Sequence, residues 1–402
     1  MYRDLKNEMM FCLKLFVYLF VLFLLLPLPV LAAGDEVKLN QLISKSPAGT
    51  IKLEARTYNI ENPVILKSGV NLIGVSGKTK FLLKAGVPWG TFVPVVDGVN
   101  VKTSRIAYIT FDMNGDKQTR PYGQGYHNGI FLKGCSNIEV DHCTFINGKG
   151  DGARFKTCSN LKIHDNVISR QGHDGIFVVD CKDVNIYNNR ITTRTNSGIR
   201  NWNSQNVIIN KNTIDAQQDG KGGYAGIQIE YSKYFENPNV VITNNVMKKT
   251  QGPGVQLIAY SAGANIKKGI TISKNQFIST GVSTFISDTG GISFKGLKGA
   301  TITNNVGDGC YNSFIWVASG GTGSIIKNNI IVNTVPHMKL SQSGTGYGIS
   351  NRAGSSFLVD YNCFWNNKKG NTYKVTALHS TFKSPFIYKI GYGFYWTGVK
   401  WG

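Results

Sequence analysis

The sequence predicts an all-β fold, a parallel β-helix solenoid, and two observations carry this prediction. The first is a short motif that occurs four times, each copy 23 residues after the last. The glycines of the four copies are Gly129, Gly152, Gly175 and Gly198. The second is that segments inside each repeat, such as 160–164 and 206–210, are short, β-branched and alternating, which is the periodicity of strands. A fixed period of this size indicates stacked coils, and coils of short strands and polar bends give a parallel β-helix.

Two further columns keep the same period. Cysteines follow the first three glycines by six residues, and a second column, mostly asparagine, follows each glycine by fourteen. Their members are Cys135, Cys158 and Cys181, and Cys143, Asn166, Asn189 and Asn212. Stacked strands lie about 4.8 Å apart, so each column should form a ladder along the rod. We expect the asparagines to stack their amides at bends in left-handed geometry. We expect the cysteines to be buried thiols, although a disulfide between neighbouring rungs is geometrically allowed.

Beyond Gly198 the same columns continue at wider spacing. The glycine column continues as Gly226, Gly254, Gly291, Phe314 and Gly348. The asparagine column continues as Asn245, Asn275, Asn305, Asn329 and Cys363. Extra residues in a solenoid leave the coils as loops on one side. We therefore expect the insertions at 213–223, 232–238, 259–268 and 335–346 to form the walls of a groove.

The first residues are typical of a signal peptide. Within 1–33, basic residues precede the apolar run 15–26, and Val30-Leu31-Ala32 offers a small-residue cleavage site. An uncleaved membrane anchor is the alternative, but the run is short for a spanning helix. We expect a secreted or cell-surface protein without stable membrane insertion.

The rest of the chain divides into two parts. Residues 34–370 should form the β-helix, and a short helix near 37–46 should cap its open end. The segment 371–402 is rich in aromatic residues and should form a C-terminal cap, or alternatively a platform for stacking sugars.

The charge favours an anionic partner. The formal net charge is +21, which suits acidic polysaccharide, nucleic acid or a membrane surface, while solubility alone is the simpler explanation. The leader argues against nucleic acid, so acidic polysaccharide is the expected partner. The sequence contains no Cys-x-x-Cys pair and no sign of a zinc site. It does not indicate an oligomeric state.

One face of the repeated strand concentrates ionisable and aromatic side chains. Because side chains alternate along a strand, the residues two after each glycine should point outward together with the acidic residues at the preceding bend. The candidate catalytic residues are Asp151, Asp174, His173 and Arg200. The candidate substrate-binding residues are His127, Asn128, Arg154, Lys156, Trp202, Tyr224, Gln228 and Glu230. The alternative is that both aspartates only stabilise Asp-Gly bends.

Two chemistries fit this cluster. Glycosidic hydrolysis needs one protonated and one ionised carboxyl, and Asp151 and Asp174 on adjacent rungs should repel, with Glu230 as a third candidate. A lyase instead removes the proton beside a uronate carboxylate. His173 or His127 would be its base, and Arg154, Lys156 and Arg200 would neutralise the carboxylate.

These motifs resemble the pectin-lyase-like superfamily of right-handed parallel β-helix proteins, over about residues 45–370. The segment 172–176 is similar to the Gly-His-Gly turn of polygalacturonases, with Asp174 inserted. The segment 154–156 is similar to their Arg-Ile-Lys clamp, but it precedes the His rung, and their Asp-Asp pair is absent. The Asn-rich coils and the segment 359–367 also resemble archaeal disaggregatase-type proteins, which are secreted hydrolases of a chondroitin-like polymer.

The resemblance implies a secreted enzyme that cleaves an acidic polysaccharide, and hydrolysis by the paired aspartates is the favoured chemistry. The alternatives are a polysaccharide lyase, a non-catalytic glycan-binding surface protein and a structural spike. We expect no cofactor for hydrolysis. A lyase would admit Ca²⁺, but Asp112, Asp116 and Asp151 lack the spacing of calcium ligands.

Overall fold

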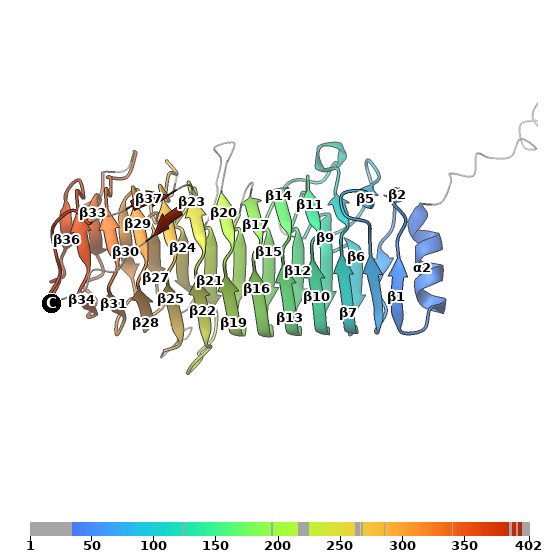
Figure 1. Cartoon of the computed structure of the whole chain (residues 1–402), viewed down its shortest axis with the longest axis horizontal. Helices are drawn as coiled ribbons and strands as arrows, with labels where there is room; N and C mark the ends of the chain where they lie inside the picture. Colours follow the sequence, from blue (N-terminus) through green and yellow to red (C-terminus); the bar gives the residue numbers. More distant parts are fainter. Residues whose placement is uncertain are drawn as a thin grey trace, which may run out of the picture.

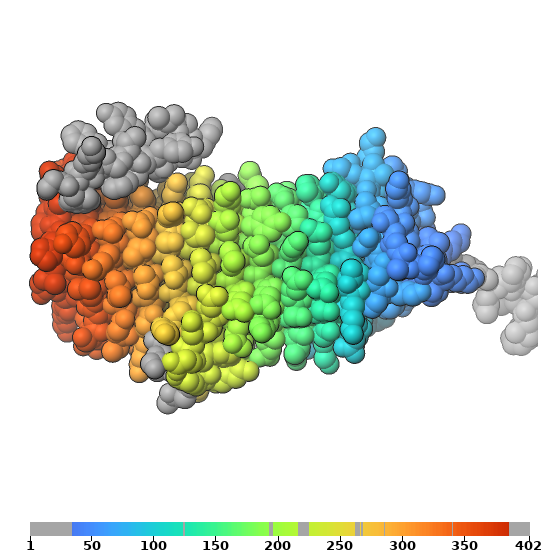
Figure 2. All heavy atoms as spheres, turned by 60° about the horizontal axis from the view of Figure 1, so that its bottom comes forward, coloured from blue at the N-terminus to red at the C-terminus, as the bar shows by residue number. Residues whose placement is uncertain are grey.

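The chain folds into a rod of stacked coils, as the sequence predicts (Figure 1). The computed structural model describes residues 34–385 except 124, 194–195, 216–224, 262–265, 267, 285 and 340, together with the strands 388–390 and 393–395. Within this part, three parallel sheets of 12 strands each run along the rod, and every coil contributes one strand to each sheet. Successive coils appear as bands from blue to red in Figure 2.

Each sheet takes every third strand of the chain, and neighbouring coils pair in sequence order. Sheet A contains β1 (Gly49–Lys52), β4 (Val70–Ile73), β7 (Lys102–Ala107), β10 (Ser136–Asp141), β13 (Ser159–His164), β16 (Lys182–Tyr187), β19 (Gln205–Asn210), β22 (Val240–Thr243), β25 (Ile270–Ser273), β28 (Ala300–Thr303), β31 (Ile325–Lys327) and β34 (Leu358–Asp360). Sheet B contains β2 (Thr57–Ile60), β5 (Lys80–Leu83), β8 (Thr110–Asp112), β11 (Thr144–Ile146), β14 (Val167–Gln171), β17 (Arg190–Thr193), β20 (Thr213–Asp215), β23 (Val246–Lys248), β26 (Gln276–Ile278), β29 (Val306–Asp308), β32 (Ile330–Val332) and β35 (Cys363–Trp365). Sheet C contains β3 (Val64–Ile65), β6 (Pro94–Val99), β9 (Asn128–Lys133), β12 (Ala153–Lys156), β15 (Ile176–Val179), β18 (Ile199–Trp202), β21 (Ile227–Tyr231), β24 (Val255–Ala259), β27 (Ile292–Lys295), β30 (Ser313–Ser319), β33 (Tyr347–Asn351) and β36 (Gly370–Tyr373).

A helix closes the first coil, as expected. Helix α2 (Asp35–Lys45) buries Leu39 and Ile43 against the end of the core. Its Asn40 bridges to β3, because the side-chain amide donates to the Pro63 carbonyl at 2.9 Å and accepts the N–H of Ile65 at 2.8 Å. The cap therefore satisfies backbone groups that an open solenoid end would leave bare.

The C-terminal end carries the last strand of sheet C and a separate pair of strands. Strand β36 extends sheet C to Tyr373, and the described chain ends in a hairpin of β37 (Tyr388–Ile390) and β38 (Gly393–Tyr395). The predicted signal peptide, 1–33, lies outside the described residues. In the described part, no helix has the length and apolarity needed to cross a membrane.

The glycine column exists because neighbouring coils approach too closely there for a side chain. A Cβ on Gly175 would lie 2.6 Å from the carbonyl oxygen of Gly198 and 2.8 Å from Ile191. Phe314 takes this place once, as predicted. Its ring fits because β29 has Gly307 at the position where the adjacent coils of sheet B have Phe277 and Ile331.

The asparagine ladder is a chain of buried amides. The side-chain oxygen of Asn189 accepts both the backbone N–H of Asn166, at 3.1 Å, and its amide N–H, at 3.0 Å, and the pattern repeats along the rod. Two expectations were wrong. The last rung is Asn362, which accepts from Asn329, and not Cys363. The left-handed conformation belongs to the residue before each ladder asparagine, such as Asn188 with φ 55°, because the ladder residue must turn its amide inward.

The cysteine column consists of thiols, as expected. All six cysteines of the described chain are free. The backbone N–H of Cys135 donates to the Cys158 sulfur at 3.3 Å, and that of Cys158 donates to the Cys181 sulfur at 3.4 Å. Ser204 continues the column by accepting the N–H of Cys181 at 2.9 Å.

Candidate active site

The outer face of sheet C brings the predicted residues onto adjacent rungs. The parallel register aligns Arg154 with Phe177, Phe177 with Arg200 and Arg200 with Gln228. The bends just before these strands carry Asp151, His173, Asp174 and Asn196. Side chains that are 23 or more residues apart in the sequence therefore lie one rung apart.

His173 is the centre of a hydrogen-bonded group. Its Nδ1 lies 2.5 Å from Asp151 Oδ1 and 3.0 Å from Asp174 Oδ2, and its Nε2 lies 2.9 Å from the Asn196 side-chain amide. Both aspartate side chains are completely buried, whereas the imidazole keeps 13% of its surface exposed. Among these three ionisable side chains, His173 is therefore the one that meets solvent.

The two carboxylates stabilise the protonated form of His173. Burial opposes the charged ring, but Asp174 and Asp151 outweigh it and raise the pKa of His173 to about 10. Burial likewise opposes ionisation of Asp151, yet the His173 charge, its hydrogen bond and Arg154 hold the pKa of Asp151 below its ordinary value. The two aspartates thus favour a protonated His173 ring at neutral pH.

A second buried ion pair lies one rung further along. Arg200 donates from Nε and Nη2 to Glu230 Oε2 at 2.9 and 2.8 Å, and its Nη1 lies 3.7 Å from Asp174. Gln228 and the Tyr260 hydroxyl, at 3.1 Å, donate to the other oxygen of Glu230. Burial raises the pKa of Glu230, and Arg200 opposes that rise.

Aromatic rings hold both guanidinium groups in place. The Arg154 guanidinium lies 4.7 Å from the Phe177 ring centre and 4.8 Å from that of Phe92. The Arg200 guanidinium lies 4.7 Å from the centre of the same Phe177 ring. Stacking on aromatic faces fixes planar guanidinium groups while leaving their edges free to donate. Trp202 in turn stacks on Tyr260, with ring centres 5.0 Å apart.

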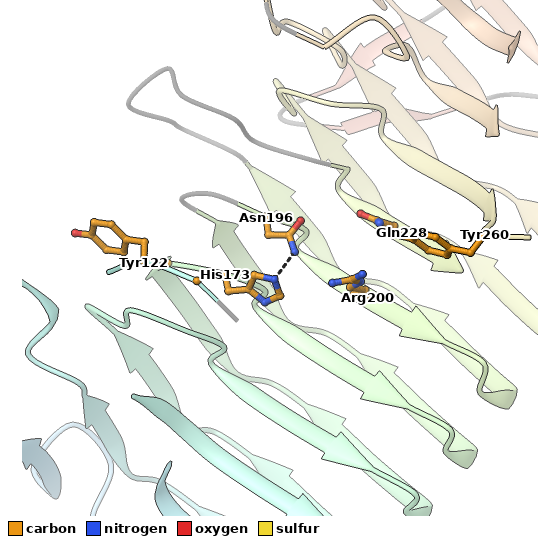
Figure 3. Close-up of a pocket in the computed structure, with 8 residues that line it drawn as sticks. Tyr122, His173, Asn196, Arg200, Gln228 and Tyr260 are labelled. Carbon is orange, nitrogen blue, oxygen red and sulfur yellow. Dashed lines mark hydrogen bonds between the residues drawn. The ribbon is translucent and has the colours of Figure 1, made fainter. Parts of the chain in front are cut away.

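A cavity of about 380 Å³ opens over this group, and we call it the His173 pocket (Figure 3). Its lining residues are Tyr122, Gly123, Gly172, His173, Asn196, Arg200, Gln228 and Tyr260. Figure 3 shows His173, Asn196 and Arg200 between Tyr122 on one side and Gln228 and Tyr260 on the other. None of these described lining residues is a carboxylic acid. Asp151, Asp174 and Glu230 lie beneath the pocket and act on it through His173, Arg200 and Tyr260.

The other predicted binding residues have varied positions. Asn128 is buried and accepts the backbone N–H of Asp151 at 2.8 Å, so it supports the bend. His127 is buried, its ring centre lies 6.0 Å from that of Trp89, and burial lowers its pKa. Lys156 is exposed at the end of strand β12. Tyr224 lies outside the described residues.

Five of the eight pocket residues were not among the predicted site residues, namely Gly123, Gly172 and three with larger side chains. Asn196 shares the sequence column of His173, which could have identified it. Tyr260 comes from the predicted insertion 259–268, so the insertion pattern located its loop but not its role. Tyr122 belongs to the loop between β8 and β9, where the repeat carries no signal.

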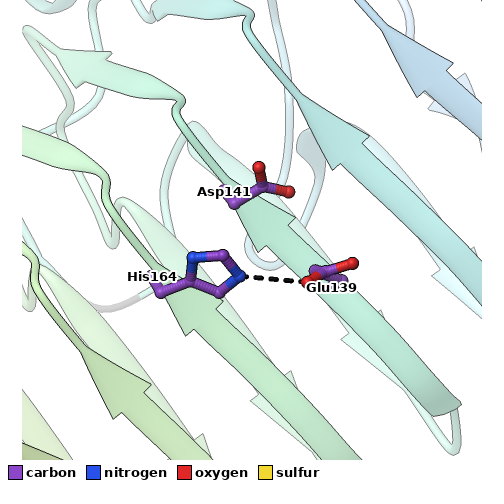
Figure 4. Close-up of side chains that lie close together, drawn as sticks. All are labelled: Glu139, Asp141 and His164. Carbon is purple, nitrogen blue, oxygen red and sulfur yellow. Dashed lines mark hydrogen bonds and ion pairs between the residues drawn. The ribbon is translucent and has the colours of Figure 1, made fainter.

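The described residues contain two groups that have the composition of a metal site. Asp151, His173 and Asp174 form one, with ligand atoms within 4.8 Å of one another. Glu139, Asp141 and His164 form the other, on sheet A (Figure 4). Arg105 donates to both oxygens of Asp141 at 2.7 Å, so that group is already neutralised as an ion-pair network. Of the three aspartates considered above as Ca²⁺ ligands, Asp151 belongs to the first group, and neither group contains Asp112 or Asp116.

Two family profiles match the chain. One, described as a right handed beta helix region, matches residues 128–296, and the other, described as disaggregatase related, matches residues 238–389. The fold is thus a right-handed parallel β-helix, as the resemblance implied. No curated protein matches the sequence significantly.

Solved structures share the fold at low sequence identity. A hyperthermoactive exopolygalacturonase from Thermotoga maritima matches with a TM-score of 0.52 and 13% identity, over 86% of this chain and 87% of that one. The A-module of a mannuronan C-5 epimerase from Azotobacter vinelandii gives 0.55 and 15%, over 87% and 94%. The catalytic domain of a GH87 α-1,3-glucanase in complex with nigerose gives 0.61 and 13%, over 88% and 67%.

Proposed function

We propose that this protein is a secreted polysaccharide-active enzyme whose substrate is an acidic polysaccharide. The observation that carries the proposal is the His173 pocket, in which an imidazole and a guanidinium with fixed orientations face an open groove on a basic protein. The enzymes that share the fold act on polysaccharides, as their names state, and they are consistent with this substrate class.

The geometry favours proton transfer beside a uronate carboxylate, and β-elimination is the reaction that it supports best. Arg200 binds the uronate carboxylate and stabilises the negative charge that develops on it. Once the imidazole ring has lost its Nε2 proton, as pH rises toward the His173 pKa of about 10, His173 takes the proton from the adjacent ring carbon at Nε2, where the substrate replaces Asn196. The electron pair of that C–H bond forms the ring double bond, the neighbouring C–O bond breaks, and water in the open pocket protonates the leaving oxygen.

Asp151 and Asp174 act through His173 in this proposal. They orient its ring from Nδ1 and set the pH at which Nε2 becomes basic. Both carboxyl groups are buried, and this mechanism does not require either of them to contact the substrate.

Glycosidic hydrolysis by Asp151 and Asp174 is the second candidate, and one observation favours it. Carboxyl oxygens of the two aspartates lie no more than 4.8 Å apart, which excludes the longer separation of inverting glycosidases and is compatible with the shorter one, about 5 Å, of retaining enzymes. This mechanism requires a carboxyl to enter the pocket, and therefore a movement of His173 or Arg200.

The products distinguish the candidates. Purified protein is incubated with a panel of uronate polymers, and new reducing ends, ultraviolet absorbance and proton NMR spectra are recorded. Elimination gives reducing ends with the absorbance of an unsaturated uronate, whereas hydrolysis gives reducing ends without it. An NMR change at the ring carbon without chain cleavage would indicate epimerisation. If no polymer changes, the proposed function is wrong.

A further inference from the structure

A second cavity adjoins the His173 pocket in the direction of the C-terminus. It has a volume of about 340 Å³, and two of its lining residues, Gln228 and Tyr260, also line the His173 pocket. The two cavities are therefore adjacent along sheet C. We call this second cavity the Lys295 pocket.

The floor of the Lys295 pocket is polar and comes from the next rungs. Gln256 of β24 aligns with Gln228 of β21, and Lys295 of β27 lies beyond it. Each rung advances about 4.8 Å along the rod. A pocket displaced by one or two rungs thus lies at the distance where the adjacent ring of a polysaccharide would fall if its chain followed the rod axis.

The walls of the Lys295 pocket have fixed orientations. Tyr260 stands between the two cavities, is held by its stack on Trp202, and exposes half of its surface. Asp288 on the opposite wall accepts a hydrogen bond from the Trp316 indole at 3.4 Å. An aromatic face beside amides, a carboxylate and an ammonium is the combination that recognises a sugar ring by stacking, its hydroxyl groups by hydrogen bonds and its carboxylate by charge.

We propose that the Lys295 pocket binds the next acidic sugar of the polymer, with Lys295 holding its carboxylate. This inference rests on the proposed function, because it assigns the neighbour of the sugar that reacts over His173. It makes Lys295 a specificity-determining residue, and it orients the substrate along the rod from β15 toward β27.

The test compares Lys295→Met with Lys298→Met, a matched control that removes an exposed charge three residues away and outside both pockets. We measure kcat/KM for uronate oligomers of increasing length. We expect Lys295→Met to lower kcat/KM about tenfold on oligomers long enough to fill both pockets, the effect of losing roughly 1.4 kcal/mol of binding. It should leave the shortest substrate unchanged, and Lys298→Met should behave like the native protein.

Calorimetric binding of a uronate oligomer that the protein does not cleave separates this inference from the proposed function. Binding that weakens in Lys295→Met supports the subsite even if the protein turns over no polymer. Equal effects of Lys295→Met at all lengths, or no effect at any length, would overturn the assignment. Loss of long-substrate binding in Asp288→Asn, with Lys295→Met unaffected, would assign a neutral sugar to the pocket and overturn the acidic one.

Discussion

Replacing Asp151 by Asn removes one of the two charges that hold the proton on His173. The asparagine keeps the size of the side chain and an oxygen that accepts the N–H of Asp174, a contact of 3.0 Å in the native protein. The negative charge 2.5 Å from Nδ1 is lost. The substitution therefore tests electrostatics with little change in shape.

The expected magnitude follows from the structure. The pKa of His173 rises from 6.5 to about 10, with Asp174 and Asp151 as the two opposing charges. One opposite charge at this distance changes a pKa by about 1–3 units, so the pKa of His173 should fall by about that amount in Asp151→Asn. Loss of one partner from a buried ion pair should also cost about 3–5 kcal/mol of stability.

NMR titration of the His173 ring and the pH profile of kcat/KM measure this effect independently. In the native protein, the elimination rate should rise with pH toward about 10 as Nε2 loses its proton. In Asp151→Asn, this rise should move to lower pH, and the maximal rate should fall because the ring is less firmly oriented. Asp183→Asn, at an exposed position of strand β16 in sheet A, is a control for loss of charge. A native His173 that titrates near 6.5, or a profile that Asp151→Asn leaves in place, would refute the reasoning.

Three further predictions concern stability and reactivity. The stabilisation from protonated His173 should be complete below about pH 6.5 and be lost as pH rises through about 10, so urea midpoints should fall across that window; a constant midpoint there would contradict the assigned pKa. Asn212→Ala removes the oxygen that accepts the amide N–H of the preceding ladder residue and should cost about 1–3 kcal/mol, whereas a loss below roughly 0.5 kcal/mol in thermal unfolding would show that the ladder is not stabilising. Cys363 is half-buried and should react with a thiol reagent in the folded protein, while buried Cys158, whose pKa is raised to about 12, should react only after unfolding; mass spectrometry of partial labelling checks the order.

The repeated part of the fold could be predicted from the sequence because each coil obeys the same steric rule. Gly175 and its counterparts must be small wherever backbones meet, and Asn189 and its counterparts must reach both neighbours. Counting failed once, where loops widen the last coils, and Cys363 was taken for the ladder residue in place of Asn362. Where an insertion interrupts the repeat, counting residues alone does not determine which of two neighbouring residues occupies the ladder position.

The candidate site was less predictable. Alternation along the strand indicated that Asp151 and Asp174 belong to the outer side of the rod, but it does not reveal what covers them. Their burial results from His173 and from guanidinium groups that stack on Phe177, and such contacts join residues from different coils. Tyr122 and Tyr260 come from loops, whose path depends on their own packing and not on the repeat.

The His173 and Lys295 pockets follow one another along the axis, so the spacing of the coils sets the distance between the sugar rings that they bind. In the sheets each strand pairs only with the strands of neighbouring coils, so insertion of one whole coil between β24 and β27 would leave every residue that lines the His173 pocket in place. It would move Lys295 about 4.8 Å further from His173 and alter which positions of a polymer are held together. Product length in such proteins can therefore change by duplication of a coil, with no substitution at the reacting centre.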